Sequence, residues 1–105
     1  MKYKISVNLE DFKTILKKTR VSQRIGKKNY ANEVVELSYT EGKFKVEIME
    51  VQRIIEASGT DDWSVIIPLS KYQYIIKVKP NSDPLIIEFD GVLKQLKIGT
   101  TSYKI

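Results

Sequence analysis

The chain has 105 residues, of which 42% are hydrophobic and 30% charged, and it contains neither cysteine nor histidine. This composition is typical of one soluble globular domain, and it excludes a disulfide framework, a thiolate site and the imidazole that most often serves as a general base. The net charge of +5 is uneven, because residues 1–31 hold nine Lys or Arg against two acidic residues while residues 32–105 hold nine against eleven, and such asymmetry indicates a surface for a polyanion.

The first predicted elements are a strand and a helix. Alternating apolar residues predict a strand over Lys2–Val7. Asn8 is a favourable N-cap, so we expect a helix from about Leu9 to Lys18 or Thr19, with its apolar residues facing inward. The outer face of this helix then carries three cations, Lys13, Lys17 and Arg20.

Residues 20–32 show no periodicity and predict a loop. It carries Arg20, Arg24, Lys27 and Lys28, and it is long for a connection within a compact domain, which indicates either a functional or a mobile segment. Three strands follow, joined by short turns, one of them at Glu41 and Gly42. Their expected ranges are Glu33–Tyr39, Lys43–Met49 and Val51–Ser58.

The remaining sequence predicts strand, helix and three strands again. The expected strands are Trp63–Ile67, Leu85–Phe89, Val92–Ile98 and Thr100–Ile105. A bulge at Gln95 would explain the interrupted alternation of the third. The helix is expected from Leu69 or Ser70 to Lys77.

The two strand–helix passages share one template. Apolar residues in Ile5–Leu16 recur sixty residues later in Val65–Ile76, first with the period of a strand and then with that of a helix. We therefore expect an α+β fold built from a duplicated βαβββ unit, with repeat units at about 1–60 and 61–105. Two helices side by side, packed on antiparallel sheets, are the simplest arrangement.

We find no motif for an enzyme, a cofactor or a metal. The sequence lacks GxSxG, GxGxxG and GxxxxGK[ST], and the adjacent carboxylates of Asp61 and Asp62 suit a turn. No apolar run approaches the length of a membrane span, so we expect a cytoplasmic protein without a membrane partner.

Charge separates by predicted element. The two helices and the long loop are basic, whereas residues 32–68 hold three basic and eight acidic residues. In the repeat, Lys17 corresponds to Lys77 and Lys13 to Gln73. Helices lying side by side would merge these positions into a surface that contacts phosphates without reading sequence.

The order of these features resembles a domain of the DNA sliding clamps, most closely that of the bacterial DNA polymerase III beta clamp. The passage WSVIIPLSKY, residues 63–72, is similar to the family's TVPAR-x-F passage from a strand into the second helix. Ile75–Pro80 is similar to its DI-x-R-x-LP ending, and Leu85–Gly91 and Ile98–Ile105 resemble its closing strands. A bacterial clamp chain carries three such domains, whereas this chain carries one.

The resemblance implies a processivity protein for DNA replication that binds the backbone of duplex DNA and forms a homo-oligomer. The implied DNA-binding residues are Lys13, Lys17, Arg20, Arg24, Lys27, Lys28, Gln73 and Lys77. Edge strands would join the copies through Val51, Arg53, Ile55, Thr101, Tyr103 and Ile105. The alternative is a module of the same fold that forms no ring and binds a replication protein or a true clamp through its free edge.

Overall fold

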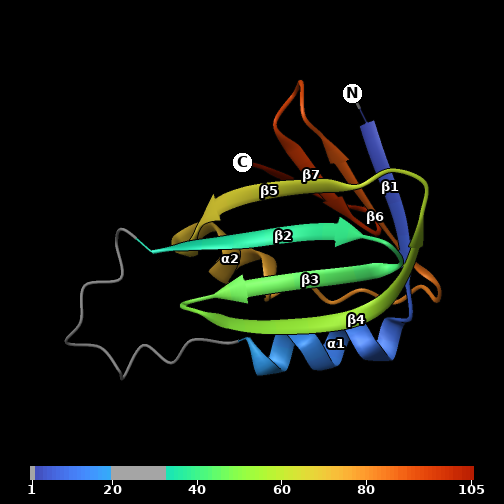
Figure 1. Ribbon diagram of the computed structural model, residues 1–105, viewed down its shortest axis with the longest axis horizontal. Helices are drawn as coiled ribbons and strands as arrows, with labels where there is room; N and C mark the ends of the chain where they lie inside the picture. Colours follow the sequence, from blue (N-terminus) through green and yellow to red (C-terminus); the bar gives the residue numbers. More distant parts are fainter. Residues whose placement is uncertain (1, 20–32) are drawn as a thin grey trace.

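A computed structural model of the chain describes residues 2–19 and 33–105, and over these residues it is a small α+β domain (Figure 1). The expected order of strands and helices is confirmed there. The elements are β1 (Lys2–Val7), α1 (Leu9–Lys18), β2 (Val34–Thr40), β3 (Lys43–Ile48), β4 (Val51–Gly59), β5 (Trp63–Pro68), α2 (Leu69–Ile75), β6 (Leu85–Asp90), β7 (Gln95–Ile98) and β8 (Thr101–Lys104).

Four elements are shorter than predicted: β3 by one residue, α2 and β8 by about two each, and β7 by three. β7 begins at Gln95 because the preceding residues form a turn, in which Oδ1 of Asp90 accepts hydrogen bonds from the backbone N–H groups of Val92 and Leu93 at 2.9 and 3.0 Å. The interrupted alternation therefore reflects this turn and not a bulge at Gln95. Helix α2 ends at Ile75, and the residues after it form a tight last turn with hydrogen bonds between residues three apart.

The strands form one curled antiparallel sheet in the order β5-β2-β3-β4-β1-β6-β7-β8 (Figure 1). Our expectation of more than one sheet was wrong because β4 is long enough to have two neighbours. Val51–Glu56 pair with β3, and Ala57–Gly59 pair with β1. The sheet is therefore continuous through β4 and ends at β5 and β8.

Strand pairing follows the same scheme on both sides of the junction between β4 and β1. We call residues 2–59 the N-terminal half and residues 63–105 the C-terminal half. β2, β3 and β4 pair in sequence order, as do β6, β7 and β8, and each half sends its first strand to the other half, where β1 pairs with β6 and β5 with β2. The registers correspond: Ile5↔Ile87 and Val7↔Leu85 in one pair, Val65↔Leu37 and Ile67↔Val35 in the other.

The two helices differ in how they begin. The side chain of Asn8 accepts a hydrogen bond from the backbone N–H of Asp11 at 3.0 Å, so α1 has the expected N-cap. Helix α2 follows Pro68, which provides no side-chain cap. Both helices pack apolar residues onto the same core, and a hydrogen bond of 2.5 Å between the buried hydroxyls of Thr19 and Tyr72 links the end of α1 to α2.

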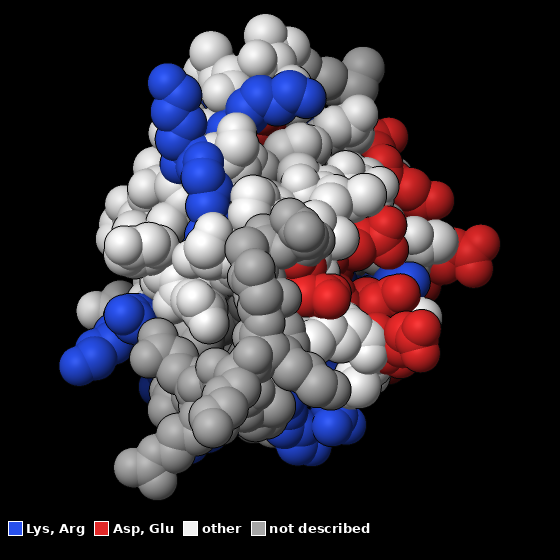
Figure 2. Space-filling view, turned by 90° about the vertical axis from the view of Figure 1, so that its left-hand side faces the viewer, with Lys and Arg blue, Asp and Glu red and all other residues white. Residues whose placement is uncertain are grey.

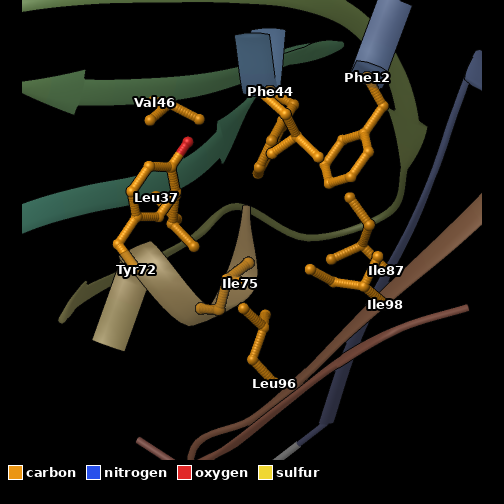
Figure 3. Close-up of a pocket in the computed structure, with 10 residues that line it drawn as sticks. Phe12, Leu37, Phe44, Val46, Tyr72, Ile75, Ile87, Leu96 and Ile98 are labelled. Atoms are coloured by element: carbon orange, nitrogen blue, oxygen red, sulfur yellow. The ribbon is translucent and has the colours of Figure 1, made fainter. Parts of the chain in front are cut away.

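The core lies between the helices and the inner face of the curled sheet. Figure 3 shows apolar side chains from both helices and both halves converging there. The space left between them is only about 10 Å³ and its lining is apolar, so it has no room for a ligand. A chain of ring contacts also crosses the halves, in the order Tyr3, Phe89, Trp63, Phe44 and Phe12.

Candidate nucleic-acid interface and assembly edges

The described cations predicted on the helices lie at the surface, although Lys77 lies in the turn after α2 and not in the helix. Lys17 and Lys77 are exposed, whereas Lys13 and Gln73 are half-buried. Nζ of Lys13 lies 3.8 Å from Oε1 of Glu10, so its charge is partly neutralised. Nζ of Lys77 lies 5.6 Å from the ring centre of Tyr74, a cation–π geometry that leaves the ammonium group open to an anion.

Lys17 has no carboxylate within ion-pair distance among residues 2–19 and 33–105. Lys17 and Lys77 are therefore the two predicted DNA-binding residues whose charge is best placed for a phosphate. The other predicted cations, Arg20, Arg24, Lys27 and Lys28, lie outside the described residues.

The opposite charge gathers on the outer face of β2 and β3. Glu36 and Glu47 are cross-strand neighbours there, and Nζ of Lys45 lies 3.9 and 3.7 Å from their carboxylates. The single positive charge of Lys45 thus lies between two carboxylates, so this part of the face keeps a net negative charge. Figure 2 shows Asp and Glu gathered on one side of the view, away from most of the Lys and Arg.

The strands β1, β6 and β7 do not follow the predicted pattern of acidic strands. On their outer face, Glu88 lies between the exposed Lys4 and Lys97, and Lys2 is the neighbour of Asp90. The prediction drew on residues 32–68, which form the strands of the N-terminal half and β5 and its turn. The acidic outer face is therefore confined to the N-terminal part of the sheet.

Of the two predicted assembly edges, β8 lies at the end of the sheet and β4 does not. β8 ends the sheet, so Thr101 and Tyr103 lie on an edge strand, and the backbone N–H of Ile105 donates to the carbonyl of Lys94 at 2.8 Å. β4 is an interior strand by sheet order, because its last three residues pair with β1. Val51, Arg53 and Ile55 lie in its other part, where the only partner among the described strands is β3.

Each of these edges borders a groove beside a helix. The groove at α1 and β4 has a volume of about 290 Å³ and is lined by Thr14, Ile15, Lys18 and residues 52–55. The groove at α2 and β8 has a volume of about 310 Å³ and is lined by Lys71, Tyr74, Ile75 and residues 102–105. In each half, a groove thus lies between the helix and the last strand.

Sequence reasoning missed the second end of the sheet, β5. Its pairing with β2 occupies one side, and no described strand pairs with the other. The signal was available, because Trp63–Pro68 contains no charged residue.

The titratable groups show no arrangement for catalysis in the described part of the chain. Burial raises the pKa of Tyr72 to about 12, so its hydroxyl stays neutral near pH 7 and acts only as a hydrogen-bonding group. No group of three or more Asp or Glu that could hold a metal ion occurs among residues 2–19 and 33–105. Neither described helix has the length and apolarity that crossing a membrane requires.

No model of a known protein family matches the chain, and no curated protein matches its sequence.

Proposed function

We propose that this protein is a clamp-like processivity protein for DNA replication in the cytoplasm, which binds duplex DNA without reading its sequence. In this proposal the helices face the phosphate backbone. Copies of the chain join through the free part of β4 and through β8. No cofactor and no catalytic step are needed, because backbone binding rests on charge and on the shape of the assembly.

The observation that carries the proposal is the agreement between strand pairing and the sequence repeat. The sixty-residue offset relates β1 to β5, and the two strands pair in the same register with β6 and β2 respectively. Each is followed directly by a helix and then by three antiparallel strands. This agreement supports an internal duplication of the βαβββ unit, with repeat units of about 1–60 and 61–105 and a clamp-like arrangement.

The charge of equivalent helix positions supports the DNA role. Lys17 and Lys77 occupy corresponding positions and are both exposed. The hydrogen bond between Thr19 and Tyr72 brings the end of α1 against α2, so the two helices share one side of the sheet. Lys13 and Gln73 are the next pair of equivalent positions, and the loop cations Arg20, Arg24, Lys27 and Lys28 would extend this surface.

The edges supply the support for assembly. The free part of β4 presents Val51, Arg53 and Ile55, and β8 presents Thr101 and Tyr103, followed by Ile105. Backbone groups on such edges pair readily with another strand. A ring of six such domains would bury both edges of every copy.

Two measurements test the proposal. Sedimentation should give a mass that is a multiple of 12.1 kDa, and the multimer should be lost when proline replaces Ser102 in β8. Two duplexes of unrelated sequence should bind with equal affinity. A strict monomer that binds neither duplex at low salt would contradict the proposal.

A second candidate function rests on the open part of β4. As a module that forms no ring, the protein would pair this edge with a replication protein or a true clamp. Replacing Lys13 and Lys17 together by Glu distinguishes the candidates. The double reversal should abolish duplex binding if the first proposal holds, and should leave capture of a purified clamp or replication protein unchanged if the second holds.

A further inference from the structure

Among the described strands β5 ends the sheet, and its own residues carry little of the usual protection against pairing. Natural edge strands commonly carry charged residues, a bulge or proline, because exposed backbone groups otherwise recruit other strands. The six residues of β5, WSVIIP, include no charge, and proline stands only at the last position. By contrast, the edge β8 contains Lys104, and the open part of β4 contains Arg53 and Glu56.

The backbone of β5 presents hydrogen-bonding groups on its open side. The N–H of Leu69 donates to the carbonyl of Glu33, the residue before β2, at 3.0 Å. This hydrogen bond shows which residues of β5 direct their backbone groups toward β2. Because pairing alternates along an antiparallel strand, the N–H and C=O groups of Ser64 and Ile66 face away from β2. Proline at position 68 fits this phase, since its missing N–H would also face outward.

At β1, the counterpart of β5, both sides of the strand are paired. β1, which precedes α1 as β5 precedes α2, pairs with β6 on one side and accepts Ala57–Gly59 of β4 on the other. Ser6 is opposite Ser58 in that pairing, and the sixty-residue offset makes Ser6 the counterpart of Ile66. The open side of β5 therefore has the geometry that receives a strand at β1.

The surroundings of β5 determine which strand would fit. On the outer face, Ile66 is 63% exposed and lies opposite Glu36, and the exposed Asp62 immediately precedes the strand. On the inner side, Val65 is half-buried against the core. A strand added here would place alternate residues beside Ser64 and Ile66, with Glu36 one strand further away, and the intervening residues beside Val65.

We propose that the open edge of β5 binds an extended segment of a partner protein in which Lys or Arg alternates with apolar residues. The partner's cations would lie on the acidic outer face, with their aliphatic stems on Ile66, and its apolar residues would pack beside Val65. A second copy of the chain is a poorer fit, because pairing of two β5 strands brings two acidic faces together. This site is separate from the helix cations and from the edges of β4 and β8.

A synthetic peptide of alternating Lys and Val tests the proposal, with a peptide of alternating Glu and Val as its control. Both carry a fluorescent label, and binding to the full chain is followed by anisotropy. The Lys peptide should bind saturably, and binding should weaken at least tenfold when Lys or Pro replaces Ile66. Amide exchange should slow at residues 64–66 when the Lys peptide is bound.

The variant Val92→Lys is the matched control, because Val92 is 74% exposed in the β6–β7 turn and belongs to no edge. It adds the same charge and should leave peptide binding unchanged. Equal binding of wild type and the Ile66 variants, or equal binding of both peptides, would overturn the proposal. Dimerisation of the free chain that is lost in Ile66→Lys would identify a second copy as the occupant and would also overturn it.

Discussion

The N-terminal and C-terminal halves share one scheme of pairing but differ at their last strands and on their outer faces. β4 has nine residues and pairs with both β3 and β1, whereas β8 has four and, among the described strands, pairs with β7 alone. The outer face of β2 and β3 is acidic, whereas Lys2, Lys4 and Lys97 lie on the outer face of β1 and β7. The shared pattern is that of the buried residues, so the core determines the fold while edges and surfaces are free to differ.

The largest expected effect tests whether the two halves form one core. Leu37 and Ile87 are buried at corresponding register positions, opposite Val65 and Ile5 respectively. Replacing either by Ala should lower the free energy of unfolding by about 2–5 kcal/mol, because a large apolar group is lost and a cavity remains. Urea denaturation should show one transition in both variants. Two separate transitions would mean that the halves are stabilised independently. A large loss of unfolding free energy in only one of the two variants would mean the same.

The junction of β4 with β1 gives the next largest effect. Gly59 lies opposite Ile5, and a Cβ atom added to it would come within 2.8 Å of Cγ2 of Ile5 and 3.1 Å of a ring carbon of Tyr39. Gly59→Ala should therefore destabilise the protein by about 1–3 kcal/mol, since the side chains or the strand must shift. Thermal unfolding measures this loss. Gly42→Ala is a less suitable control because its φ of 81° adds backbone strain, so Ser58→Ala serves instead and should cost little.

The hydroxyl pair between the helices gives a smaller effect with a defined pH dependence. Burial raises the pKa of Tyr72 from 10.0 to about 12 in the folded chain. Between these values the unfolded chain has released the proton and the folded chain has not, so the free energy of unfolding should fall with rising pH by about 1.4 kcal/mol per pH unit from this group. The stabilisation is fully present below pH 10.

Tyr72→Phe provides the comparison for that pH dependence. Near pH 7 it should cost only about 1 kcal/mol, the typical net value of one hydrogen bond, because Oγ1 of Thr19 still donates to the carbonyl of Ile15 at 2.7 Å. Above pH 10 the free energy of unfolding of the variant should fall less steeply than that of the wild type. Parallel pH profiles for the two proteins would show that Tyr72 ionises as freely in the folded chain as in the unfolded chain.

The sequence predicted the elements well because their signals are local. Alternation located most strand residues, and Asn8 located the start of α1 to the residue. The start of β7 was wrong, because Val92 and Leu93 look like strand residues and only the hydrogen bonds to Asp90 turn the chain there. Local patterns also could not reveal that β4 joins two groups of strands, since that depends on pairing between Gly59 and Ile5, which are distant in sequence.

The candidate site was predictable only where it depends on helix periodicity. Spacing along α1 correctly placed Lys17 at the surface, whereas Lys77, predicted on the second helix, is exposed in the turn after α2. The partial neutralisation of Lys13 by Glu10 depends on side-chain conformation, which spacing only permits. The open edge of β5 was missed because an uncharged apolar run is found both in buried strands and in unprotected edge strands, and only the order of the sheet separates these cases.

The salt dependence of duplex binding tests the central claim most directly. Lys17→Gln combined with Lys77→Gln removes one charge from α1 and one from the turn after α2, and Lys4→Gln combined with Lys97→Gln removes two from the outer face of the sheet. The slope of log affinity against log salt concentration should shrink by about 2 in the helix variant and remain that of the wild type in the sheet variant. Equal slopes in the wild type and the helix variant would contradict the claim that the helices face the phosphates.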